Sequence, residues 1–117
     1  MQTSVQITFR GLDHSEAVEE LVRKEAARLD GHFDRIVSCR VVIEATHRQQ
    51  QKAKIFHVRI DLGVPGAELV ANRDPAEPGA HSDPALAVRD AFRVITRQLQ
   101  DYVSRHRHQH IKVPASD

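Results

Sequence analysis

The stretch from residue 84 to about residue 107 constrains the fold of this chain more than any other. When it is placed on a helix at about 100° per residue, its apolar side chains gather within one arc of roughly 120°. The residues of this arc are Val88, Ala91, Phe92, Ile95, Leu99, Tyr102 and Val103. A second row beside the arc holds Arg89, Arg93 and Arg97, one helical turn apart. Such a helix offers one face to a hydrophobic core and a row of guanidinium groups to an anion.

Shorter segments elsewhere alternate apolar and polar residues, which is typical of half-buried strands. They predict strands at residues 5–9, 36–45, 56–62 and 67–72. In the second of these strands, the shared buried face is expected to consist of Val37, Cys39, Val41 and Ile43. Polar residues at 46–52 and a Pro- and Gly-containing stretch at 74–83 predict a turn and a loop.

A first helix is predicted between the first two strands, where a helical period is set by Val18, Val22, Ala26 and Leu29. Ser15 is expected to cap its start and Gly31 to end it. Glu25 lands beside the apolar arc, where it is either an edge residue that reaches solvent or a buried carboxylate. Asp83 and Pro84 predict the start of the last helix.

The predicted order is therefore strand, helix, three strands, helix. A right-handed crossover through the first helix makes the first two strands parallel, and short connections make the later pairs antiparallel. The sequence predicts a two-layer α+β fold, β-α-β-β-β-α, with a four-stranded mixed sheet and two helices packed on one face. We expect one domain over residues 1–104, followed by a basic, histidine-containing C-terminal tail at 105–117 that is frayed over residues 107–117.

The net charge of +1 conceals an uneven distribution. Basic residues gather at 35–59 and 89–112, and acidic residues at 13–34 and 61–83, which indicates one positive face and one negative face. Cys39 is the only cysteine, and its place in a strand suits a core thiol better than a nucleophile. No signal peptide is visible and no apolar run approaches the roughly 20 residues that span a bilayer, so we expect a cytoplasmic protein with no membrane partner.

Five short motifs carry a family likeness, in the order VQIT at 5–8, FDRI at 33–36, VVIE at 41–44, GAELVA at 66–71 and RQL at 97–99. Through them the chain resembles the ribosome hibernation-promoting factor family, also called ribosome-associated inhibitor A or sigma-54 modulation proteins. The likeness covers about residues 5 to 102 and implies a short-type member. It also implies a fold that resembles double-stranded-RNA-binding domains.

The resemblance implies that the protein binds the small ribosomal subunit in the channel that normally holds mRNA and tRNA anticodons. There it would inhibit translation in stationary phase or stress, which is ribosome hibernation. The partner would be small-subunit rRNA, with no cofactor, metal, small-molecule substrate or catalysis. By position, the implied rRNA-binding residues are Arg23, Lys24, Arg28, Arg89, Arg93 and Arg97, and the basic tail adds Arg105 and Arg107. Phosphate contacts predict salt-dependent binding that is largely indifferent to base sequence.

The arginine row by itself also fits a solvated helix face. Asp101 lies four residues from both Arg97 and Arg105, so ion pairs on the helix surface could neutralise part of the charge. A related alternative is a small RNA-binding module that acts away from the ribosome.

The histidines suggest a different class of protein, a small enzyme that uses metal or acid–base chemistry. His47, His57 and Glu44 lie on or near adjoining strands, and this interpretation requires a closed pocket around them. His106 and His110 are four residues apart, which suits two metal ligands on a helix. A solvated basic tail is the simpler interpretation of the second pair.

Overall fold

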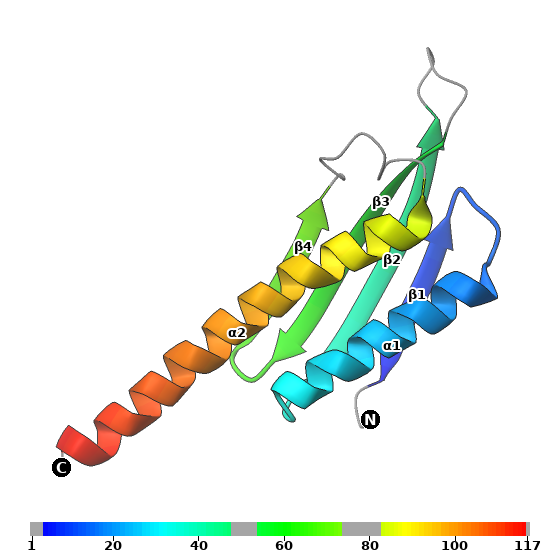
Figure 1. Ribbon diagram of the computed structural model, residues 1–117. Helices are drawn as coiled ribbons and strands as arrows, with labels where there is room; N and C mark the ends of the chain where they lie inside the picture. The colour runs from blue at the N-terminus through cyan, green and yellow to red at the C-terminus, as the bar shows by residue number, and fades with distance from the viewer. Residues whose placement is uncertain (1–3, 48–53, 74–82, 117) are drawn as a thin grey trace.

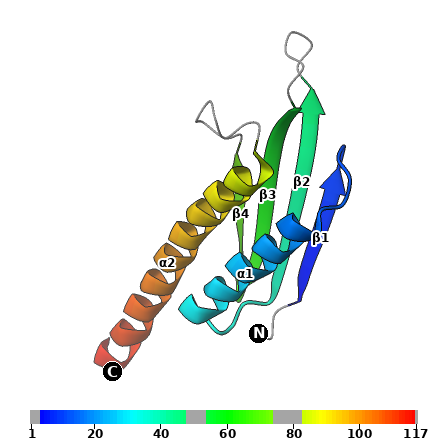
Figure 2. The ribbon, with the colours of Figure 1, turned by 45° about the vertical axis from the view of Figure 1, so that its right-hand side comes forward.

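The computed structural model describes residues 4–47, 54–73 and 83–116. Its elements follow the predicted order: β1 (Val5–Arg10), α1 (Glu16–His32), β2 (Ser38–His47), β3 (Lys54–Val64), β4 (Ala67–Arg73) and α2 (Pro84–Ser116). The strands form one four-stranded sheet in the order β1-β2-β3-β4. Both helices lie side by side over the same face of this sheet (Figures 1 and 2). The predicted two-layer α+β fold is confirmed.

Strand pairing also follows the prediction. β1 runs parallel to β2, as the crossover through α1 requires, whereas β2–β3 and β3–β4 are antiparallel. The register places Ile7 beside Val41 and Val41 beside Ile60. Apolar residues of neighbouring strands therefore meet on the face that the helices cover.

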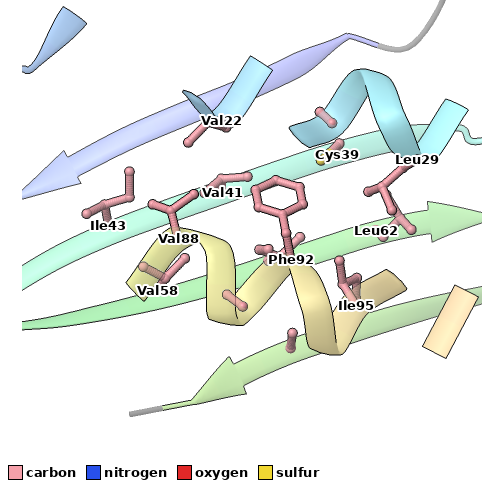
Figure 3. Close-up of a cluster of buried hydrophobic side chains, with 14 of the residues drawn as sticks. Val22, Leu29, Cys39, Val41, Ile43, Val58, Leu62, Val88, Phe92 and Ile95 are labelled. Atoms are coloured by element: carbon pink, nitrogen blue, oxygen red, sulfur yellow. The ribbon is translucent and has the colours of Figure 1, made fainter. Parts of the chain in front are cut away.

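The core lies between the sheet and the helices, where Phe92, Val22 and Leu29 are almost completely buried (Figure 3). Every member of the apolar arc predicted on α2 is buried except Val103, which is partly buried against the core. No polar or charged residue is buried within the described ranges. Hydrophobic burial, rather than a polar network, therefore holds the two layers together.

The helix starts are capped as predicted. The Val18 amide donates to the Ser15 hydroxyl oxygen at 3.2 Å, and the Ala85 amide donates to the Asp83 carboxylate at 2.9 Å. α1 runs to His32, one residue beyond the predicted stop at Gly31. Its last turn closes with a bond from the Phe33 amide to the Leu29 carbonyl oxygen, so no left-handed glycine is needed there.

Val37 corrects the predicted buried face of the second strand. Its side chain is 67% exposed, whereas Cys39, Val41 and Ile43 are buried as expected. β2 begins only at Ser38, and the Val37 amide donates to the Gly63 carbonyl oxygen just before the ladder starts. Outside the ladder, the alternation of a pleated strand no longer directs the side chain toward the core.

The backbone of residues 105–116 corrects the expectation of a frayed tail. α2 continues as a helix to Ser116 and extends past the end of the sheet (Figure 1). Neither Gly nor Pro occurs between residues 105 and 113, so no helix breaker interrupts the pattern. The domain boundary at residue 104 stays a prediction. The predicted turn at 46–52 and loop at 74–83 fall largely on residues 48–53 and 74–82, outside the described residues.

Candidate nucleic-acid interface

A groove of about 530 Å³ lies between α1 and α2. Cationic side chains line both of its walls: Lys24 and Arg28 on α1, and Arg89, Arg93 and Arg97 on α2. We call this feature the interhelical groove. It brings together five of the eight residues that were predicted to bind rRNA, although they belong to opposite ends of the chain.

The local sequence explains how each wall forms. Side chains four residues apart share one face of a helix, so Arg89, Arg93 and Arg97 form a row beside the buried stripe of α2. On α1, Lys24 and Arg28 have the same spacing, and His32 continues their row along the groove. Because both helices bury their apolar stripes on the same sheet, the two polar rows face each other across the groove.

Ion pairs neutralise only part of this charge. Arg28 lies 3.6 Å from Glu25 and Arg93 lies 3.6 Å from Asp90. Both arginines are well exposed, and pairs of this kind contribute little free energy. Within the described ranges, no ion pair involves the three remaining cations of the groove, Lys24, Arg89 and Arg97.

Asp101 does not neutralise the row in the way that its spacing suggested. Among the described residues its carboxylate forms no ion pair with Arg97 or Arg105. The Arg105 guanidinium instead donates from Nε to the backbone carbonyl oxygen of Asp101, at 3.4 Å. The groove therefore keeps cations that are free to bind an anion, and arginine forks suit phosphate oxygens in particular.

Comparison with known proteins decides the family. Residues 5–107 match the family model described as "Sigma 54 modulation protein / S30EA ribosomal protein". The chain belongs to this family. It is similar to the ribosome hibernation promoting factor of Azotobacter vinelandii, with 32% identity over 95 residues that cover 81% of this chain and 78% of that protein.

Solved structures of similar proteins support the fold of this S30EA family member. A ribosomal subunit interface protein from Coxiella burnetii has a TM-score of 0.68 and 21% identity, and the match covers 86% of this chain and 97% of that one. The N-terminal domain of Thermus thermophilus Protein Y has a TM-score of 0.66 and 20% identity, over 87% of this chain and 99% of that one. At these identities the likeness concerns the fold.

Three of the residues implied for rRNA binding in this S30EA chain do not line the groove. Arg23 points to another face of α1 and donates to the Glu19 carboxylate at 3.1 Å. Hydrogen bonds from His14 and then from Arg23 lower the pKa of the Glu19 carboxyl. Arg105 lies beyond the groove on α2, and the side chain of Arg107 falls outside the described part of the structure.

Among the groove residues that were not predicted from the sequence, two are titratable, His32 and Glu25. His32 could have been found, because it stands four residues after Arg28 and extends the same row. Glu25 agrees with the edge-residue interpretation, since its side chain is 16% exposed. Its position in a cationic groove depends on how the two helices pack, which no local pattern indicates.

Two residues of the enzyme alternative, Glu44 and His57, line a depression of about 520 Å³ on the outward face of the sheet. These two residues are register partners on β2 and β3, and His57 Nε2 lies 3.2 Å from the Thr46 hydroxyl. Every residue that lines the depression comes from the same sheet face, so no second described element closes over it. The side chain of His47, the third residue of this hypothesis, falls outside the described residues.

Of the histidine pair on α2, only His106 has a described side chain, and it packs against Tyr102. The His106 ring lies 4.0 Å from the Tyr102 ring, centroid to centroid, and its Nδ1 lies 3.0 Å from the Tyr102 carbonyl oxygen. The side chain of His110 is not among those described. In the described part of the chain, no group of three or more His, Cys, Asp and Glu residues is placed to hold a metal ion.

Cys39 is a core residue, as its position in the strand predicted. Its side chain is 2% exposed. Burial raises the pKa of its thiol to about 11, and the charge of Asp30 adds to this effect. A thiol that stays protonated at neutral pH is a poor nucleophile.

In the described ranges, no helix has the length and apolar character needed to cross a bilayer.

Proposed function

We propose that this protein binds the decoding channel of the small ribosomal subunit through its interhelical groove and inhibits translation in stationary phase or stress. The observation that carries the proposal is the pair of cationic rows that face each other across the groove. Family membership and the similarity to a ribosome hibernation promoting factor support the ribosome as the partner. This partner implies a cytoplasmic location.

The chemistry of the groove favours the phosphates of rRNA as its ligand. Arginine binds phosphate through two parallel hydrogen bonds, and rows on two walls can hold a sugar–phosphate strand from both sides. The Phe and Tyr side chains, all of which the structure describes, offer no stacking platform, because Phe56, Phe92 and Tyr102 are buried and Phe9 and Phe33 pack against the core. The protein therefore recognises the shape and charge of the RNA backbone rather than its bases.

Occupation of the decoding channel explains the inhibition without any catalytic step. A folded domain held on the rRNA phosphates of this channel excludes mRNA and tRNA anticodons by its volume alone. Release then requires only that the phosphate contacts break, which keeps the ribosome intact for later use. No cofactor, metal or small-molecule substrate enters this mechanism.

Charge reversal of the α2 row tests the proposal. We expect the triple substitution Arg89→Glu, Arg93→Glu and Arg97→Glu to abolish co-sedimentation with small subunits and inhibition of translation in a cell-free system. All three side chains are exposed, so the circular dichroism spectrum should stay that of the folded protein. Full ribosome binding by the folded triple variant would refute the groove as the interface.

A matched variant controls for net charge. Arg10, Arg35 and Arg40 are exposed and lie outside the groove. Their reversal to Glu changes the net charge by the same amount, so a much smaller loss of binding is expected. Equal losses in the two variants would show that only the total charge matters.

The ribosome can be distinguished from other RNA by fractionation. In a sucrose gradient of a stationary-phase lysate, the protein should sediment with small subunits or whole ribosomes. Sedimentation with ribosome-free RNA alone would favour the alternative of an RNA-binding module that acts away from the ribosome.

A further inference from the structure

One carboxylate lies among the cations of the interhelical groove. Glu25 lines it together with Lys24 and Arg28 of the same helix, and its side chain is 16% exposed. Among the described lining residues it is the only acid. A carboxylate repels phosphate, so direct contact with phosphate does not explain this group. Its position therefore suggests that the ligand also carries a hydrogen-bond donor.

The Glu25 carboxylate has unused capacity to accept hydrogen bonds. Arg28 Nη1 lies 3.6 Å from its Oε2, which is beyond hydrogen-bonding distance. No other described group donates to it. An ionised carboxylate can accept about four hydrogen bonds, so it can take a donor from a ligand in the groove while Arg28 still balances its charge.

RNA presents a suitable donor at a suitable place. Its backbone carries a 2′-hydroxyl on each sugar, between consecutive phosphates, and DNA has no such group. Groove cations repeat every four residues, a rise of about 6 Å along each helix, and so can contact consecutive phosphates. A carboxylate within this row then meets the sugar edge. Thr96 also lines the groove, but its hydroxyl donates its proton to the Phe92 carbonyl oxygen, at 2.6 Å, and so is not available as a donor to Glu25.

We propose that Glu25 accepts a hydrogen bond from a ribose 2′-hydroxyl and thereby makes the groove select RNA over DNA. This inference rests on the proposed binding of rRNA by the groove. Lys24, Arg28 and the α2 row hold the phosphates whatever the sugar. Glu25 weakens all phosphate binding slightly by repulsion, and RNA alone regains this loss through its hydroxyl.

The test compares three hairpins of one sequence: RNA, DNA and 2′-O-methyl RNA. The methylated hairpin keeps the helical shape of RNA but lacks the donor, so it separates the hydrogen bond from the groove geometry of the nucleic acid. Fluorescence anisotropy at low salt gives the three dissociation constants for the full-length protein. We expect the RNA hairpin to bind about fivefold more tightly than the methylated one, as one hydrogen bond to a partly exposed acceptor would contribute.

Glu25→Ala should reduce this preference to about one, because the methylated hairpin gains from the lost repulsion while RNA also loses its acceptor. Glu20→Ala is the matched control, since Glu20 is an exposed residue of the same helix outside the groove and should leave the preference unchanged. Partial unfolding would weaken binding of every hairpin and leave the ratio intact, so the ratio reports on the hydroxyl contact.

Two results would overturn the inference and leave the proposed function standing. The first is equal binding of RNA and methylated RNA by the unaltered protein, and the second is an unchanged preference in Glu25→Ala. Failure of the unaltered protein to bind any hairpin, together with failure to sediment with ribosomes, would overturn the proposed function and this inference together.

Discussion

Gly11 occupies a position that only glycine tolerates well. The chain leaves β1 there with φ of +76°, a left-handed conformation that strains other residues. A Cβ at this position would also overlap the carbonyl oxygen of Ala45 on β2. The close approach lies where the chain leaves β1 at the edge of the sheet and turns toward α1.

We expect Gly11→Ala to lower the free energy of unfolding by more than about 1 kcal/mol, because strain and overlap act together. Gly31→Ala is the opposite case, because a Cβ there meets nothing within 4 Å and the residue is helical. It should stabilise the protein by about 0.5–1 kcal/mol. Urea unfolding followed by circular dichroism measures both effects, and a destabilised Gly31→Ala would contradict the local geometry.

Burial of Cys39 links stability to alkaline pH. Below about pH 9 the thiol is protonated in both folded and unfolded chains, so the whole stability is present. Between about pH 9 and pH 11 the unfolded chain loses this proton and the folded chain keeps it. We expect the free energy of unfolding to fall by about 1.4 kcal/mol per pH unit over this window from this group alone.

The non-titrating variant Cys39→Ala isolates this contribution. It should start less stable at neutral pH, because a buried group is removed, but should lose stability less steeply above pH 9. Urea titrations of both proteins across the window give the two slopes. Parallel slopes would mean that the thiol ionises as easily in the folded protein as in the unfolded chain.

At the scale of elements, Tyr102 connects α2 to the sheet through a hydrogen bond and ring packing. Its hydroxyl donates to the Pro65 carbonyl oxygen at 2.6 Å, in the turn between β3 and β4. Its ring meets the edge of the Phe33 ring at 5.6 Å, centroid to centroid, where the chain leaves α1. Gln98 adds a second hydrogen bond, which its side-chain amide donates to the Val70 carbonyl oxygen at 2.9 Å. These contacts set the position of α2 and hence of the second groove wall.

We expect Tyr102→Phe to lower the free energy of unfolding by about 0.5–1.5 kcal/mol, since it removes the hydroxyl and keeps the ring packing. Tyr102→Ala should cost about 3–5 kcal/mol, because the packing is lost as well. Thermal and urea unfolding measure the difference. Equal stability of Tyr102→Phe and the unaltered protein would show that water replaces the bond to Pro65 without cost.

At the scale of the whole molecule, a net charge of +1 coexists with a strongly cationic groove. Within the described residues, acidic groups elsewhere balance the total without forming an ion pair with Lys24, Arg89 or Arg97. Binding should therefore respond to the local field of the groove rather than to the overall charge. Association with an rRNA surface releases counterions in proportion to the phosphates contacted.

This relation gives a prediction for single substitutions. The slope of the logarithm of the association constant against the logarithm of salt concentration should fall in magnitude by about one for Arg93→Gln. Arg40→Gln, on the outward sheet face, should leave the slope unchanged. Ribosome binding measured over a series of salt concentrations tests this, and an unaltered slope in Arg93→Gln would remove that residue from the interface.

Most helices, strands and buried faces of this protein could be predicted from local sequence patterns. Periods of about 3.6 and 2 residues placed the helices and strands, and identified their buried faces, because burial repeats with the geometry of each element. Ser15 and Asp83 marked the helix starts through short-range hydrogen bonds. The arginine row of α2 was equally local. Val37 was misassigned because the pattern does not indicate where the ladder itself begins.

The composition of the groove was decided by tertiary structure. Sequence position alone gave Arg23 and Lys24 equal standing, yet the packing of α1 against α2 directs Lys24 into the groove and leaves Arg23 with Glu19. The same packing places Glu25 among the cations. The physical reason is that a helical period fixes the angle of a side chain around its own axis. Only the contact between two helices that are distant in the sequence determines which side chains face a shared ligand.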